Sequence, residues 1–159
     1  MIRLCLVLVS CCVLGFLAVP GFGMIDTLPL PDLVRQAEMI CIAKVVQVNE
    51  VSVDKDQVST VKNVLLSEKL LKGSWQAMEP IVVMTRQSGK YGTVGSLEDQ
   101  VEFPPKGSHV VLFLKKAKDG SLEPVNLLQG VWPLDGQKPL GMGLGITLQQ
   151  LEEVVKLNR

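Results

Sequence analysis

Catalytic chemistry in this chain would have to centre on His109, the one histidine of the sequence. A Ser-His-acid or Cys-His set needs a histidine that takes a proton from a nearby nucleophile. Ser108 directly precedes His109, and on a strand adjacent side chains point to opposite faces. Cys41 lies in the apolar run at residues 39–43, which favours a small buried side chain over a reactive thiol. We therefore expect a structural histidine, an inert cysteine and no catalytic residues.

The types and spacing of the residues do not match those of known metal or phosphate sites. Zinc takes about four nitrogen or sulfur ligands, but beyond the N-terminal segment the chain has one histidine and one cysteine. The acidic stretch at residues 54–56 lacks the glycine and the later acidic residues of a calcium loop. The glycine-rich stretches at 88–92 and 141–145 lack the spacing of phosphate and dinucleotide loops. The sequence predicts no metal site and no cofactor.

Four side chains are the candidates for binding a ligand: Trp75, Lys90, Tyr91 and Trp132. Aromatic residues make up only 4% of the chain, whereas a stacking platform for bases or sugars uses several on one face. Both tryptophans stand near turns, so each either closes an end of the fold or forms an exposed anchor. Lys90 and Tyr91 lie in the glycine-rich segment 87–95, which we expect to be the most mobile contact segment.

A mainly β fold must position these residues. Valine-rich runs predict long strands at 39–53 and 58–72, because β-branched side chains pack well on a pleated surface. Five or six strands at short spacing predict a small closed or partly closed barrel. The run at 110–114 is apolar throughout and should be buried on both faces. The shorter strand candidates are residues 81–85, 101–103, 110–114, 125–128 and 130–134.

Two short helices are expected beside the strands. The first covers residues 31–38, where Pro31 suits the first turn, and it buries Leu33, Val34 and Ala37. The second starts at Thr147, which has capping-box spacing with Gln150, and includes an i,i+4 pair of Glu152 and Lys156. Its apolar stripe, which should lie on the barrel or sheet, comprises Leu148, Leu151, Val154, Val155 and Leu157.

The first residues of the chain read as a signal peptide. Arg3 is followed by an apolar stretch that ends at a Pro/Gly break, and Gly21 and Gly23 suit the −3 and −1 positions of a cleavage site. We expect cleavage after Gly23, a mature domain at residues 24–159 starting at Met24, and export to the periplasm or the medium.

Two alternatives would leave the domain tethered to the membrane. The apolar stretch at residues 4–19 would remain as an uncleaved anchor, although it is shorter than the ~20 residues that span a bilayer. Alternatively, residues 8–11 form a lipobox in which Cys11 receives lipid. In neither case does the mature chain beyond residue 23 contain a membrane span.

Charge and cysteine content narrow the possible partners. Removing residues 1–23 takes one arginine from 16 basic and 16 acidic residues, which leaves a net charge of −1. No basic field is present to hold nucleic acid. Cys41 is the only cysteine that remains, so the mature chain cannot form an internal disulfide.

Five segments occur in an order that resembles a known family. They read LVRQAEMICIAKVVQV, SEKLLKG, IVVMT, FPPKGSHVVLFL and LLQGVW, and lie within residues 31–134. This order resembles a group of uncharacterised bacterial exported domains, similar to the netrin/tissue-inhibitor-of-metalloproteinase type of OB barrel. The resemblance implies a five- to six-stranded OB-like barrel with a short N-terminal helix and a C-terminal helix.

The resemblance does not carry over an inhibitory mechanism. The metalloproteinase inhibitors of that fold chelate the protease metal with an N-terminal, disulfide-bonded cysteine, but here the predicted N-terminus is Met24 and Cys41 has no partner. Fold alone does not transfer function. The sequence favours an exported, non-enzymatic domain that binds an unknown protein or envelope component. The alternatives are a loop-inserting protease inhibitor and, with least support, a hydrolase that uses dispersed carboxylates and His109.

Overall fold

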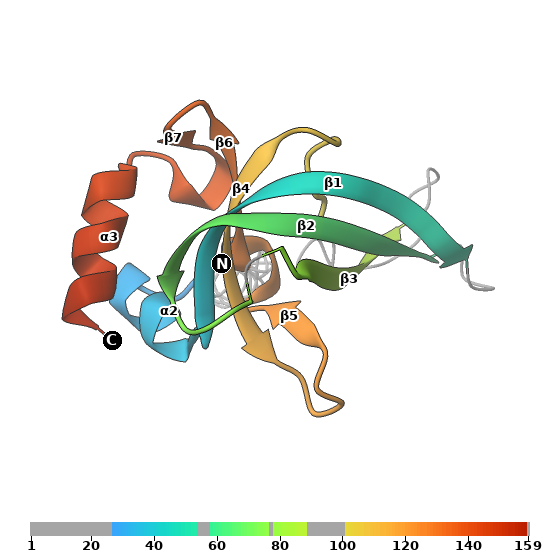
Figure 1. Ribbon diagram of the computed structural model, residues 1–159, viewed down its shortest axis with the longest axis horizontal. Helices are drawn as coiled ribbons and strands as arrows, with labels where there is room; N and C mark the ends of the chain where they lie inside the picture. The colour runs from blue at the N-terminus through green and yellow to red at the C-terminus, as the bar shows by residue number, and fades with distance from the viewer. Residues whose placement is uncertain (1–26, 54–57, 77, 89–100, 159) are drawn as a thin grey trace, which may run out of the picture.

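The strands and helices are arranged as in Figure 1, where β1 and β2 form a long hairpin that runs away from the helical side of the molecule. The computed structural model describes residues 27–53, 58–76, 78–88 and 101–158. Its helices are α2 (Leu30–Gln36), α3 (Leu148–Leu157) and the 3-10 helices η2 (Leu127–Gly130) and η3 (Gly141–Gly143). Its strands are β1 (Met39–Val53), β2 (Val58–Lys72), β3 (Pro80–Ser88), β4 (His109–Lys116), β5 (Leu122–Pro124), β6 (Val131–Asp135) and β7 (Lys138–Pro139).

Five of the strands close into a barrel in the order β1-β2-β3-β5-β4, because β4 also pairs with β1. β3 and β5 pair in parallel through Val83 and Leu122, and the other pairs of the barrel are antiparallel. β6 and β7 extend the sheet beyond β4. A small five-stranded barrel of this kind has the OB-like architecture. The predicted mainly β, OB-like barrel with a helix near each end is therefore confirmed.

The first half of β1 contributes to two cores, because successive side chains on a strand point to opposite faces. Cys41 points into the barrel and belongs to the interior cluster, which also contains side chains of β2, β3 and β4. Ile40 is fully buried on the other face, in a cluster with Leu33 of α2 and Leu151 of α3. β4 alternates in the same way, which confirms the burial of residues 110–114 on both faces.

The two long strands begin and end where the valine-rich runs predict, and Gly73 follows the end of β2. Gly73 has a φ of +86°, a conformation in which side chains are strained. A Cβ at this position would also collide with the carbonyl oxygen of Glu38. Glycine is therefore required where the chain turns away from β1.

Two of the shorter predicted strands are wrong. Residues 101–103 form no strand, although Val101 and Phe103 are buried in the barrel interior. In place of a strand at 125–128, β5 ends at Pro124 and η2 follows. Asn126 and Leu127 have φ values of 49° and 45°, and this left-handed backbone ends the extended chain.

Both predicted helices are present, with small differences. α2 ends at Gln36, and the apolar residues expected to be buried there are buried: Leu33, Val34 and Ala37. The capping box of α3 is confirmed, with Gln150 N donating to Thr147 Oγ1 at 3.1 Å and Thr147 N donating to Gln150 Oε1 at 2.8 Å. The predicted apolar stripe is too long by one residue, because Leu157 at the helix end is 83% exposed.

The first described residues are fastened to the barrel by a glutamine. Gln129 Nε2 donates to Leu28 O at 2.6 Å, and Gln129 Oε1 accepts from Leu28 N at 2.9 Å. The side-chain amide thus pairs with Leu28 much as a neighbouring strand would. The predicted signal segment, residues 1–23, lies outside the described residues. Within the described ranges, no helix combines the length and the apolar character needed to cross a membrane.

Candidate binding surface

Trp132 is buried, so of the two alternatives given for it the exposed anchor, and with it a direct contact to a ligand, is wrong. Its side chain is 1% exposed and lies in the core between the sheet and the helices. The ring packs against Phe113 with centroids 4.7 Å apart, and Nε1 donates to the carbonyl oxygen of Gln129 at 2.8 Å. The cause is tertiary, because the pairing of β6 with β4 sets Trp132 opposite Val111, on the side that faces the helices.

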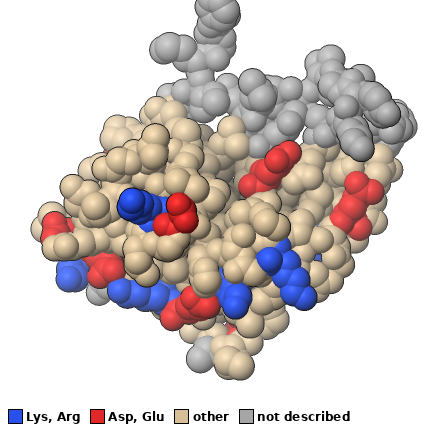
Figure 2. All heavy atoms as spheres, turned by 90° about the horizontal axis from the view of Figure 1, so that it is seen from above, with Lys and Arg blue, Asp and Glu red and all other residues tan. Residues whose placement is uncertain are grey.

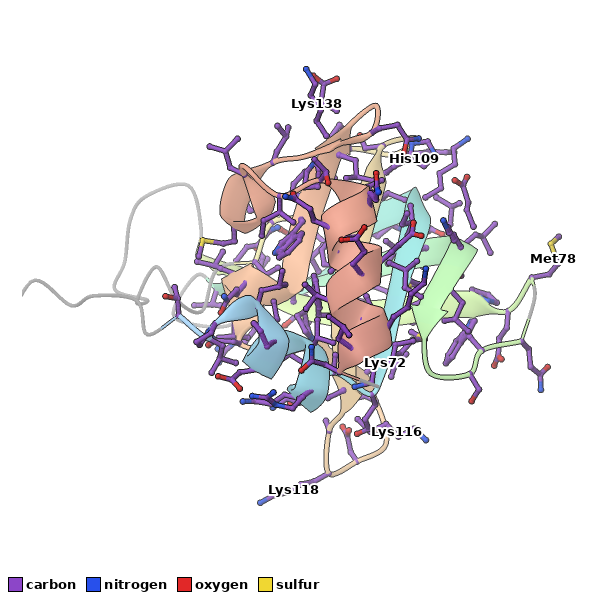
Figure 3. All side chains as sticks on the ribbon, turned by 90° about the vertical axis from the view of Figure 1, so that its left-hand side faces the viewer. Lys72, Met78, His109, Lys116, Lys118 and Lys138 are labelled. Carbon is purple, nitrogen blue, oxygen red and sulfur yellow. The ribbon has the colours of Figure 1, made fainter. Side chains whose placement is uncertain are left out.

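Trp75 is half-buried and packs against the barrel interior. Its Nε1 donates to the carbonyl oxygen of Glu79 at 2.9 Å, which joins the two ends of the β2–β3 loop. Met78 of this loop is 85% exposed and projects away from the barrel in Figure 3. Lys90 and Tyr91, the other two candidates, lie outside the described residues.

Cys41 is buried, as the sequence predicts. The residue is 0% exposed, and burial raises the pKa of its thiol from 9.0 to about 12, while a hydrogen bond with Ser67 lowers it to a smaller extent. Because the thiolate is the reactive form, both the burial and the raised pKa disfavour reaction at this thiol at neutral pH.

His109 lies at the surface and pairs with a carboxylate. Its Nε2 is 3.2 Å from an oxygen of Glu68, and both side chains are nearly half exposed, at 41% and 48%. The sequence does not reveal this pair, because 41 residues separate its members and β1 lies between their strands. Among the described side chains, no three of His, Cys, Asp or Glu gather closely enough to hold a metal ion.

The outward-pointing residues of β1, β2 and β3 form a continuous surface, which we call the outer sheet face. The inward residues of β2 alternate with them and are buried, as Val61, Asn63 and Leu65 show. Register places each outward residue of β2 beside one on β1 and one on β3. The face consists of Lys44, Gln47, Asn49 and Ser52 on β1, Thr60, Lys62, Val64 and Leu66 on β2, and Pro80, Val82, Met84 and Arg86 on β3.

The outer sheet face combines exposed apolar side chains with cations. Val82 and Met84 are 37% and 45% exposed, and they stand beside Val64 and Lys62 of β2. Its twelve positions include three cations and neither a carboxylate nor an aromatic ring. Figure 2, which views the molecule from above Figure 1, shows acidic and basic side chains scattered among the other residues. The face thus offers apolar contact, amide and hydroxyl groups, and positive charge.

The strands that carry the outer sheet face could be predicted from the sequence. The β-branched residues in 58–66 and 80–86 indicate two strands, although neither stretch alternates between polar and apolar residues. What the sequence does not show is that Lys62 and Met84 are neighbours, because that depends on the register between β2 and β3.

No protein-family model matches the chain, and no curated protein has a significantly similar sequence. The resemblance to netrin-type barrels stays a prediction. The functional argument therefore rests on the surfaces described above.

Proposed function

We propose that this chain is an exported, non-enzymatic domain that binds a protein or another envelope component through its outer sheet face. The observation that carries the proposal is the composition of that face, on which exposed Met84 lies beside Lys62, exposed Val82 lies beside Val64, and none of the twelve positions is a carboxylate. Small barrels of the OB type commonly use the face of their second and third strands for ligands.

The chemistry of the face favours a protein partner over nucleic acid or sugar. Stacking on bases or sugar rings needs aromatic side chains, and the twelve positions contain none. Apolar side chains beside two lysines and an arginine suit a partner surface that presents apolar residues together with carboxylates. Export is part of the proposal and depends on the predicted signal segment at residues 1–23.

A charge reversal on the outer sheet face tests this function. We expect Lys62→Glu to weaken binding to a solubilised envelope fraction of the native host by about ten-fold or more, a change of ~1.4 kcal/mol. The matched control is Lys138→Glu, because Lys138 is also exposed but lies on β7 at the far edge of the sheet. An equal loss of binding in the two variants would contradict the proposal. So would the absence of saturable binding in both the parent chain and Lys138→Glu.

Export is tested separately by the intact mass and N-terminal sequence of the protein from its host. A start at Met24 without added mass supports a free exported domain. A lipid-modified Cys11 or a retained Met1 supports the tethered alternative, in which the partner belongs to the membrane surface.

A loop-inserting protease inhibitor is the second candidate, and the β2–β3 loop is the observation that favours it. Met78 combines 85% exposure with a φ of 70°, which is uncommon for a residue with a side chain. The Trp75–Glu79 hydrogen bond of 2.9 Å fastens the loop near this residue. Secreted serine and metalloproteases should then be inhibited by the chain and not by Met78→Asp. Full protease activity in the presence of excess parent chain would eliminate this function.

A further inference from the structure

The second half of β1 has a neighbouring strand on one side only. β1 pairs with β2 as far as Val53, but its pairing with β4 ends at Lys44 and His109. The last backbone hydrogen bonds on the β4 side are Val45 N to Ser108 O at 2.9 Å and Gly107 N to Val45 O at 2.8 Å. Beyond Val45, the described part of the chain supplies no strand to that edge. Figure 1 shows this half of the hairpin running away from the helices.

Side chains do not bury this edge. Every residue from 47 to 53 is exposed, and Val51 and Val53 are 56% and 48% exposed. In the first half of β1, by contrast, Cys41, Ala43 and Val45 are all fully buried. Among the described residues, none bonds to the backbone N–H and C=O groups that point to the open side beyond Val45.

The edge also lacks the side chains that usually block strand addition. Natural proteins protect open edges with lysine, proline, bulges or short strands. Residues 46–53 contain no lysine, arginine or proline, and their one charged residue is Glu50, whose carboxylate accepts a hydrogen bond from Ser59 Oγ at 2.7 Å. Register shifts, each a bulge or irregularity of the kind that protects edges, flank residues 47–50 on both sides, so the regular stretch is four residues long. The edge therefore suits only a short added strand centred on these four residues.

We propose that the open edge of β1 at residues 46–53 binds an extended peptide segment of a partner protein by strand addition. Unpaired N–H and C=O groups along an edge match the main chain of another strand, which supplies affinity with little dependence on sequence. Exposed Val51 and Val53 favour β-branched side chains in the added strand, and Glu50 favours a basic residue opposite it. In a second copy paired antiparallel in the one register that sets Glu50 opposite Glu50, the like charges would be destabilising.

The inference goes beyond the proposed function, because it concerns the edge of the sheet and not its outer face. The probe is a soluble eight-residue peptide with blocked ends, in which valine and threonine alternate around a central lysine. Hydrogen exchange of the unaltered chain should slow at residues 46–53 when the peptide is added. The same peptide N-methylated at two adjacent central residues loses a donor on each of its edges, and should bind about ten-fold more weakly or worse.

Two variants of the chain locate the peptide. Val51→Lys places a natural edge-blocking residue on β1 and should weaken peptide binding by about ten-fold. Leu70→Lys is the matched control, because Leu70 is an exposed apolar residue of the neighbouring strand β2 but lies outside both the outer sheet face and the open edge. We expect it to bind the peptide within about two-fold of the parent chain, a difference below ~0.5 kcal/mol.

Several results would overturn the proposal. They are equal binding of the N-methylated peptide, equal loss in Val51→Lys and Leu70→Lys, slowed exchange at β3 in place of β1, and no binding at millimolar peptide. Dimerisation of the free chain that Val51→Lys abolishes would assign the edge to a second copy instead. If Val51→Lys does not fold, the comparison of the two peptides on the unaltered chain still decides the question.

Discussion

The two halves of β1 contain similar residues in different surroundings. Val45 is 0% exposed, because β2 flanks it on one side, residues 107–108 bond to it on the other, and its side chain points into the barrel, whereas Val51 is 56% exposed. Both valines suit a strand equally well, so β propensity does not distinguish them. The difference shows that the stabilisation a strand residue provides comes from the layers that cover it. The covered half, residues 39–45, packs in the cores that stabilise the fold. The open half, residues 46–53, leaves its side chains exposed, where a partner could contact them.

The largest test of this comparison is truncation of one side chain in each half. Ile40→Ala removes a fully buried side chain between β1 and the helices, and we expect it to lower the free energy of unfolding by about 2–5 kcal/mol. Val51→Ala removes an exposed side chain, and we expect a change within about 0.5 kcal/mol. Urea denaturation of both variants measures the difference. Equal losses would show that the open half is covered in solution.

The pH dependence of the free energy of unfolding gives a second test of the covered half of β1, because Cys41 is buried there. Burial raises the pKa of its thiol from 9.0 to about 12, so between these values the unfolded chain releases a proton that the folded chain keeps. The contribution of this thiol is therefore fully present below pH 9 and is lost as the pH rises towards 12. The free energy of unfolding should fall by up to about 1.4 kcal/mol per pH unit in this window.

Two variants isolate the thiol from lysine and tyrosine, which titrate in the same range. Cys41→Ala should lose stability less steeply above pH 9 than the parent chain, as urea unfolding between pH 8 and 11 would show. A cysteine placed in the open half, Val51→Cys in the Cys41→Ala background, should not restore the slope, because an exposed thiol keeps its usual pKa. Parallel curves for the parent chain and Cys41→Ala would contradict the burial of Cys41.

A smaller effect is expected from the helix that covers the first half. Thr147→Ala removes the hydroxyl that accepts from Gln150 N at 3.1 Å and caps α3. We expect a loss of about 1 kcal/mol in the free energy of unfolding. Thr147→Ser keeps a hydroxyl acceptor and should retain most of the stability. Identical midpoints for the Ala and Ser variants would mean that the cap contributes nothing to covering β1.

The smallest effect is expected from the ion pair that joins α3 to β2. Lys69 Nζ lies 2.7 Å from Glu152 Oε1, but both side chains are partly exposed, at 54% and 32%. Exposed pairs contribute about 0.2–1 kcal/mol and are screened by salt. A double-mutant cycle with Lys69→Ala and Glu152→Ala should give a coupling in this range that shrinks at ~1 M salt. A larger, salt-independent coupling would mean that packing of α3 depends on this contact.

Local sequence patterns were sufficient to predict features that depend on the residues of a single strand or helix. The bounds of β1 and β2, the capping box at Thr147 and the burial of Cys41 all follow from residues close in sequence. The reason is that hydrophobic periodicity and cap chemistry act within one strand or one helical turn. The predicted strand at 125–128 failed because the left-handed backbone at Asn126 and Leu127 leaves no hydrophobic pattern of its own.

Tertiary structure alone decided how the elements meet. Pairing of β6 with β4 buried Trp132, which the sequence offered as an exposed anchor, and the crossing of strands brought His109 to Glu68. The outer sheet face and the open edge of β1 arise from register and from the point at which β4 leaves β1. The sequence by itself determined a mainly β barrel with a helix near each end. Which side chains face a partner was decided only by contacts between residues far apart in the chain, because no local pattern records which layer covers a strand.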